Sequence, residues 1–167
     1  MLDKKAGGEA GCPVSDDCPV SSVCAPTRRP CADMTRAHQE TLDLCRSLEA
    51  IADGLPRLDR LQCLRAANRL VPLLKASHAY EEEVVFPAFE AARPPAAAVG
   101  RLKTEHLEDE CAAEELTEVL FRLGHGGRLE NPEALGFMLR AFFNALRRHI
   151  AFERHHILPA LPAAAPA

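Results

Sequence analysis

The chain has 167 residues, 47% of them hydrophobic, and a formal net charge of −4. This length gives room for one domain with a substantial core, and the mildly acidic balance argues against a nucleic-acid or anionic-membrane partner, because both bind basic surfaces. No run of about 18 apolar residues occurs, and the N-terminus lacks the apolar stretch of a secretory signal. We therefore expect a protein without membrane contact, located in the cytoplasm.

Residues 1–32 differ in composition from the rest of the chain. They are rich in Gly, Pro, Ser and Cys, and they carry no helical or strand period, so they predict a flexible tail. Their cysteines recur every six or seven residues, unlike the Cys-x-x-Cys of a zinc site: Cys12, Cys18, Cys24 and Cys31. Their role stays open among exposed thiols, redox-active thiols, and ligands of a metal, haem or iron–sulfur species.

From residue 33 to residue 161 the apolar residues recur with the period of a helix. The first predicted helix has Asp33 as its N-cap and ends near Gly54. The second starts after Pro56 and stops before Pro94, and Pro72 should bend or interrupt it. The first helix has an apolar stripe formed by Leu42, Cys45, Leu48 and Ile51.

Two further helices complete the predicted domain. The third begins near Pro95 and ends at Gly124. The fourth has Asn131 as cap and Pro132 at its first position, and Pro159 ends it before an Ala/Pro tail at residues 162–167. Four helices with short connections predict an all-α, up-down four-helix bundle.

Three of the seven histidines have a glutamate four residues later, which exceeds the chance expectation: His78/Glu82, His106/Glu110 and His149/Glu153. This spacing puts both side chains on one helix face, one turn apart. A metal ion can then bind an imidazole nitrogen and a carboxylate of the same helix.

These pairs, together with His38, continue the apolar stripes and should point into the bundle. Ionised carboxylates are costly there unless a cation compensates, and the chain offers no comparable set of core-facing Lys or Arg. Metal ions are the simplest compensation. The candidate ligands are His38, His78, Glu82, His106, Glu110, His149 and Glu153.

The helical rise of about 1.5 Å per residue puts His78, His106 and His149 at nearly one level of the bundle. His38 is offset by about 9 Å unless residues 55–60 are irregular or Pro72 takes up the difference. Six or seven converging donors exceed the four that one structural zinc needs. Imidazole and carboxylate donors suit iron, manganese or zinc, and we predict two iron ions bridged by carboxylates.

Several neighbours of these residues carry weaker expectations. Glu110 is a seventh ligand, an outer hydrogen-bond acceptor, or one more charge in an acidic run. Glu81 and Glu83 are expected to face solvent, and Tyr80 to pack. The helical cysteines are expected to be buried: Cys45, Cys63 and Cys111.

Three segments resemble the hemerythrin-like, His-His-Glu cation-binding family: SHAYEEEVVFPAFE at 77–90, EHLEDE at 105–110 and RHIAFERH at 148–155. The resemblance covers about residues 33–161 and implies a four-helix bundle with an iron pair. In this pattern His38 and His78 would serve one iron, and His106 and His149 the other. Glu82 and Glu153 would bridge them.

The ligand pattern also bears on function. Oxygen-carrying hemerythrins have a second His one turn after the third-helix His and an Asp after the last one, whereas Glu110 and Glu153 stand here. The pattern is more similar to bacterial di-iron proteins that repair iron centres damaged by nitric oxide or oxidants, although those proteins usually carry a longer N-terminal domain with its own cysteine motif.

The sequence thus predicts a di-iron protein that binds or reacts with O2, NO or peroxide. Its role would lie in oxidative or nitrosative stress or in iron–sulfur cluster repair, with iron–sulfur proteins as partners. The alternative is a sensing or iron-storage module without catalysis. Whether the protein is an enzyme, and its oligomeric state, stay open.

Overall fold

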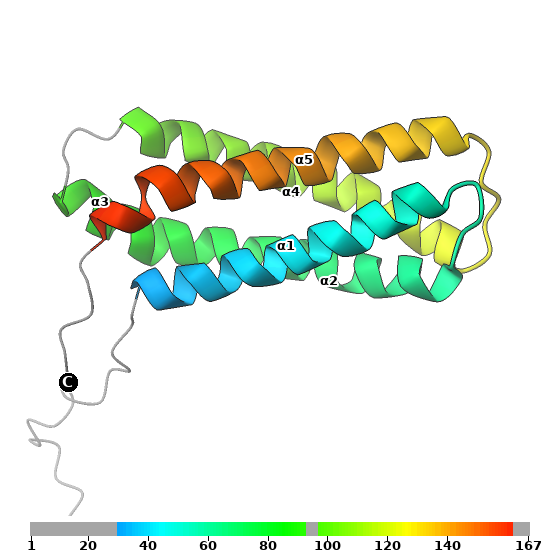
Figure 1. The fold of residues 1–167 in the computed structure, drawn as a ribbon, viewed down its shortest axis with the longest axis horizontal. Helices are drawn as coiled ribbons and strands as arrows, with labels where there is room; N and C mark the ends of the chain where they lie inside the picture. Colours follow the sequence, from blue (N-terminus) through cyan, green and yellow to red (C-terminus); the bar gives the residue numbers. More distant parts are fainter. Residues whose placement is uncertain (1–29, 93–96, 162–167) are drawn as a thin grey trace, which may run out of the picture.

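The computed structural model describes residues 30–92 and 97–161 as a bundle of four long helical segments (Figure 1). The long helices are α1 (Pro30–Gly54), α2 (Arg60–Tyr80), α4 (Ala97–Gly124) and α5 (Pro132–His156). The predicted all-α four-helix bundle is confirmed. Most of the predicted flexible tail, with Cys12, Cys18 and Cys24, lies outside the described residues, as does the Ala/Pro tail, but residues 30–32 with Cys31 belong to α1 and not to a tail.

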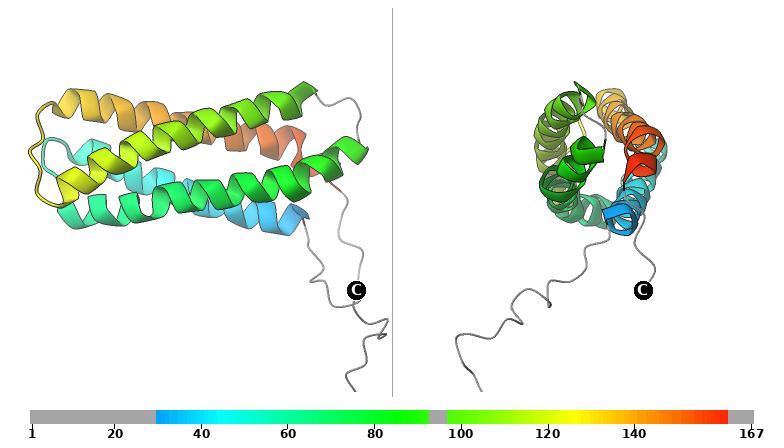
Figure 2. Two further views of the ribbon diagram at one scale, coloured as in Figure 1. Left: turned by 180° about the vertical axis from the view of Figure 1, so that it is seen from behind. Right: turned by 90° about the vertical axis from the view of Figure 1, so that its left-hand side faces the viewer.

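Consecutive long helices run antiparallel and close into a four-sided bundle. Helix α1 packs against α2 and α5, and α4 packs against the same two helices. The α1–α2 and α4–α5 connections lie at one end of the bundle (Figures 1 and 2). The short α3 (Phe86–Ala92) lies at the other end.

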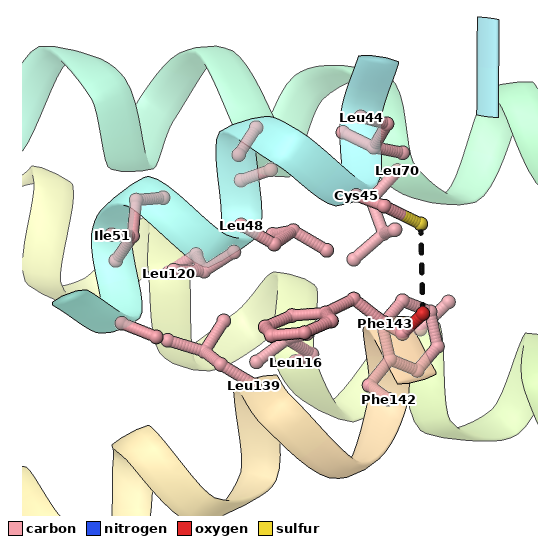
Figure 3. Close-up of a cluster of buried hydrophobic side chains, with 14 of the residues drawn as sticks. Leu44, Cys45, Leu48, Ile51, Leu70, Leu116, Leu120, Leu139, Phe142 and Phe143 are labelled. Atoms are coloured by element: carbon pink, nitrogen blue, oxygen red, sulfur yellow. Dashed lines mark hydrogen bonds between the residues drawn. The ribbon is translucent and has the colours of Figure 1, made fainter. Parts of the chain in front are cut away.

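The core has two apolar clusters, one toward each end of the bundle. The larger one contains leucines of all four long helices, among them Leu48, Leu70, Leu120 and Leu139. In it the Cys45 thiol donates to the Phe143 carbonyl at 3.8 Å (Figure 3). The smaller cluster contains Met34, Val85, Phe86, Phe89, Val99, Leu102, Ile157 and Leu161. On every helix the polar buried residues fall between these two clusters in the sequence.

The starts of α2 and α5 show the local chemistry that begins these helices. Asp59 accepts from the backbone N–H groups of Leu61 and Gln62 at 2.9 and 3.1 Å. Asn131 accepts from the Ala134 N–H at 2.9 Å, with Pro132 at the first helical position. A side-chain acceptor satisfies N–H groups that have no partner inside the helix. The predicted cap of α5 is confirmed.

The predicted start of the first helix was wrong. Helix α1 begins at Pro30, so Asp33 lies in its first turn and does not cap it. Proline is favoured in a first turn, where its missing N–H would be unpaired in any case. The Asp33 carboxylate instead pairs with Arg36 at 2.9 Å and accepts from the Tyr80 hydroxyl at 3.3 Å.

The second predicted helix is interrupted, but not at Pro72. Helix α2 runs through Pro72, and the irregularity is a π-helix at Glu81–Val85, followed by α3. There the Phe86 N–H donates to the Glu81 carbonyl, five residues back. A π-turn holds one residue more than the α-helical turn and changes which side chains face the core. Val85 and Phe86, at the end of this turn, are both buried.

Among the described residues, no helix is long and apolar enough to cross a membrane.

Candidate metal centre

A layer of buried polar side chains separates the two apolar clusters. Six of its members are at most 7% exposed and come from α1, α2, the π-helix, α4 and α5: His38, His78, Glu81, His106, His149 and Glu153. Five of these six are predicted ligands. The bundle therefore brings together histidines that lie more than a hundred residues apart in the sequence.

The expected offset of His38 is removed by the connection between α1 and α2. Helix α2 begins only at Arg60, so residues 55–59 are not helical. His38 precedes Gly54 by 16 residues and His78 follows Arg60 by 18, which leaves a difference of about 3 Å at the helical rise. His38 therefore reaches Glu153, and its Nε2 donates to Oε2 at 2.9 Å.

Three of the imidazoles stack on one another. The ring centroids of His78 and His106 are 3.9 Å apart with an angle of 4° between the planes, and those of His106 and His149 are 5.1 Å apart. Rings this close cannot all be protonated without strong repulsion. Burial first, and then the charge of His106, lower the pKa of His78. A neutral imidazole is the form that binds a metal ion.

Two buried carboxylates contact these rings. Glu81 Oε2 lies 3.1 Å from His106 Nε2, and Glu153 Oε1 lies 3.5 Å from His149 Nε2. Burial would raise the pKa of Glu153, but contacts with His149 and His38 hold it well below its usual range. Burial also lowers the pKa of His106, yet the Glu81 and Glu82 carboxylates outweigh it and raise that pKa.

These contacts are close but lack the alignment of hydrogen bonds. Glu81, His106, His149 and Glu153 each offer one donor atom within 4.8 Å of the other three. Within the described residues, the buried atoms without a hydrogen-bond partner include His106 Nε2, Glu81 Oε2, His149 Nδ1, His149 Nε2, Glu153 Oε1 and His38 Nδ1. Unpaired buried polar atoms are costly. Converging donors without mutual hydrogen bonds are what a metal site requires, so the residues present fit a metal ion.

A small cavity adjoins these donors. It measures about 10 Å³. Five of the six buried polar residues named above line it, all except His106, together with the hydroxyl-bearing Thr41 and Ser77. This volume holds about one water molecule. The space among the donors is therefore on the scale of a single ion or water molecule.

Outer carboxylates contact the far side of the rings. Glu110 Oε1 accepts from His78 Nδ1 at 2.9 Å, and Glu82 Oε1 accepts from His106 Nδ1 at 2.9 Å. A carboxylate on the second ring nitrogen fixes the tautomer and orientation of a metal-binding imidazole. Of the alternatives for Glu110, the structure matches the outer acceptor.

The structure corrects the placement of two consecutive glutamates. Glu81 was expected to face solvent, which is wrong: it is 2% exposed, and Ser77 Oγ donates to its Oε1 at 2.8 Å. Glu82 was expected to bridge the metal ions. It lies outside the group of four, as His38 and His78 do, with a side chain 37% exposed, and its role as a ligand stays a prediction. Glu81 continues the regular buried face of α2, and its backbone N–H still donates to the Ser77 carbonyl four residues back. Glu83 is exposed as expected.

A sequence signal for Glu81 did exist. It stands seven residues after the buried Leu74 and four before the buried Val85, which is the spacing of one helix face. The His-x-x-x-Glu pairing drew the prediction to Glu82 instead. Asp109, with 8% exposure, was also missed, and burial raises its pKa to about 6.

The helical cysteines divide between core and surface. Cys45 and Cys63 are buried as expected, and burial raises the pKa of Cys45 to about 11. Cys111 was expected to be buried, but it is exposed, because it follows Glu110 on the outer side of α4. Cys31 is exposed at the start of α1.

Comparisons with known proteins agree with this geometry. The family model described as the hemerythrin HHE cation-binding domain matches residues 29–161, which is most of the chain. No curated protein and no solved structure gives a significant match. The chain belongs to the hemerythrin HHE cation-binding domain family, and it has a buried His/Glu cluster that could hold a metal ion.

Proposed function

We propose that this chain is a non-haem di-iron protein that binds or reacts with O2, NO or peroxide in the cytoplasm. Its role would be in the response to oxidative or nitrosative stress or in the repair of iron–sulfur clusters. The observation that carries this proposal is the buried layer of four imidazoles and two carboxylates, five of which (all but His78) have a buried atom without a hydrogen-bond partner. Six donors exceed what one tetrahedral ion takes, and this excess supports two ions.

The surroundings of the donors suit a redox-active metal. The apolar clusters on both sides of the polar layer keep bulk water from it. The outer carboxylates Glu82 and Glu110 orient His106 and His78. Bound iron would supply the electron exchange with the small molecule, while these residues supply neutral imidazoles, charge balance and a dry site.

The cavity beside the donors is small. About 10 Å³ next to His78, Glu81 and Glu153 holds one water-sized species, and a bound ion would itself take this space. The choice of O2, NO or peroxide therefore rests on the donor set and not on the volume of this cavity.

A sensing or storage module without catalysis is the second candidate. The observation that favours it is the lining of the cavity, where every titratable group is itself one of the six candidate donors. Within the described residues, no further acid or base lines the cavity to move protons during turnover.

Iron content is the decisive first measurement. Protein reconstituted with Fe(II) without oxygen should retain about two irons per chain after gel filtration, and a Glu81→Ala/Glu153→Ala variant should retain less than one. Wild-type protein that holds no iron would end the proposal, and one iron per chain would reject the di-iron form.

Reaction with peroxide or NO then separates the two candidates. Consumption of many equivalents of peroxide or NO per chain, abolished in the Glu81→Ala/Glu153→Ala variant, supports an enzyme. Stoichiometric consumption supports a sensor or store. Recovery of a damaged iron–sulfur enzyme on addition of the iron-loaded protein supports repair.

A further inference from the structure

A surface groove between α4 and α5 has no role in the proposal so far. It measures about 420 Å³ and is lined by Glu105, Glu108 and Asp109 from α4 and by Arg148, His149 and Phe152 from α5, with Arg101 at its side. The small cavity beside the metal centre is a separate space. His149 lines both spaces, so its ring is the partition between the surface groove and the buried donors.

The two nitrogens of His149 face different spaces. Nε2 lies 3.5 Å from Glu153 in the metal centre, whereas Nδ1 lies 3.4 Å from Glu105 Oε2 and 3.6 Å from Asp109 Oδ2 in the groove. His149 is 7% exposed, and neither nitrogen has a hydrogen-bond partner. An unpaired imidazole nitrogen thus points toward two carboxylates that line the groove.

We propose that the groove is a binding site for an incoming divalent metal cation, through which the centre is loaded. Glu105 and Asp109 would hold the cation next to His149 Nδ1, and rotation of the imidazole would then admit it to the centre. This inference rests on the proposed function, because it needs a centre that takes up metal. It assigns to Glu105 and Asp109 a role in uptake rather than in the final site.

The distances in the groove suit a cation. A metal with bonds of about 2.0–2.1 Å to nitrogen and oxygen separates neighbouring tetrahedral donors by roughly 3.4 Å. The two contacts of His149 Nδ1 are close to this separation. Asp109 is 8% exposed and makes no hydrogen bond among those found in the described residues, so its charge is poorly compensated without a cation.

The basic residues of the groove do not reverse this preference. The Arg101 guanidinium is paired with Glu105 Oε1 at 3.1 Å and stacks 4.3 Å from the centroid of the Phe152 ring. It therefore occupies one oxygen of Glu105 and leaves the other toward His149. Arg148 is exposed at the surface. The carboxylates, not the guanidinium groups, are the charges in contact with His149.

The test compares rates of metal uptake in two matched variants. Glu105→Gln/Asp109→Asn removes two carboxylates one turn apart on α4. Glu114→Gln/Glu118→Gln removes two with the same spacing on the same helix, from a groove of about 460 Å³ between α2 and α4. Metal-free protein is mixed with Fe(II) or Co(II) without oxygen, and the rate and final amount of binding are recorded.

The proposal expects uptake at least fivefold slower in Glu105→Gln/Asp109→Asn, with the same final metal content as wild type. The control pair should stay within twofold. Equal rates in both pairs would overturn the route, and so would a lower final content, because that result would make the two carboxylates supports of the centre. Wild-type protein that takes up no metal would end the proposed function as well.

A third variant keeps the test valid if the double variant folds poorly. Arg148→Glu changes an exposed side chain at the groove and adds negative charge there. Uptake should become faster at low ionic strength, and the gain should disappear at high salt because surface electrostatics are screened. Unchanged or slower uptake would contradict a cation route through this groove.

Discussion

Three consecutive glutamates, Glu81, Glu82 and Glu83, lie in three different environments. The first is buried among the donors, the second accepts a hydrogen bond from His106 Nδ1 at the edge of the centre, and the third is exposed. Their side chains are chemically identical, so differences among their variants report position alone. Glu81 turns inward because it continues the regular buried face of α2, and Glu82 and Glu83 follow it around the helix.

Substitution of each of these residues by glutamine should therefore have graded effects on metal affinity. Glu81→Gln removes a donor of the centre and should cause the largest loss. Glu82→Gln removes an outer acceptor, and such changes cost about 10–100-fold in affinity. Glu83→Gln should match wild type. Competition with a chromogenic chelator measures all three affinities. A larger loss for Glu82→Gln than for Glu81→Gln would contradict the assignment of Glu81 as the inner carboxylate.

Asp109 is a carboxylate whose burial opposes folding. Burial raises its pKa from 3.8 to about 6 in the folded chain. The folded state therefore binds this proton more tightly than the unfolded state, and ionisation of the group destabilises the fold. The penalty is complete above about pH 6 and disappears below about pH 4. A side chain with this cost in the metal-free protein is consistent with a role in holding a cation.

Asp109→Asn should therefore stabilise the metal-free protein at high pH. The free energy of unfolding should rise by about 1–3 kcal/mol at pH 8, and the gain should vanish near pH 4. Urea titration in the presence of a chelator measures this difference. Glu108→Gln, an exposed neighbour, is the control and should change stability by less than about 0.5 kcal/mol at either pH. A gain in Asp109→Asn that does not depend on pH would contradict the assignment.

At the scale of elements, Pro72 and Pro132 occupy helix positions at which proline has opposite effects on stability. Pro72 lies inside α2 at an exposed position, where it removes a hydrogen bond to the Asn68 carbonyl and crowds that carbonyl. Pro132 is at the first position of α5, where no such bond exists. Pro72→Ala should raise the free energy of unfolding by about 1–3 kcal/mol, whereas Pro132→Ala should be neutral or slightly destabilising. Chemical denaturation of both variants measures the contrast, and a loss of stability in Pro72→Ala would contradict it.

The element pattern was largely predictable from the sequence, because apolar periodicity and caps are local. The Asn131 cap and the end of a helix at Gly124 follow from neighbouring residues alone. The π-helix could not be found in this way. Val85 and Phe86 pack into the second apolar cluster, but adjacent buried residues also occur on the regular helices, so this pattern does not reveal an extra residue.

The residues of the candidate site also divide into those that the sequence predicts and those that it misses. His38, His78, His106, His149 and Glu153 lie on regular α-helical turns, so their spacing was enough to predict that they meet. Their role as ligands stays a prediction. Glu81 also continues the regular face of α2, but the His-x-x-x-Glu spacing selected its neighbour Glu82 instead.

For the whole molecule, the polar layer divides the core into two apolar clusters. The layer places buried donors, several without partners, at a level where a bundle would otherwise have leucines. Each unpaired buried group costs about 1–3 kcal/mol. We therefore expect the two apolar clusters to supply most of the stability of the metal-free bundle. A bound ion should stabilise chiefly the polar layer between them.

Metal binding should accordingly raise the thermal stability of the whole domain. A ligand that binds only the folded state at 100 times its Kd adds about 2.7 kcal/mol, which for a chain of this size corresponds to roughly 5–10 °C in Tm. Differential scanning calorimetry with Fe(II) under argon and with a chelator measures the shift. Glu81→Gln should lose most of it, whereas Glu83→Gln should keep it. Equal Tm values with and without metal would mean that the buried donors are satisfied within the protein, and that the layer is not a metal centre.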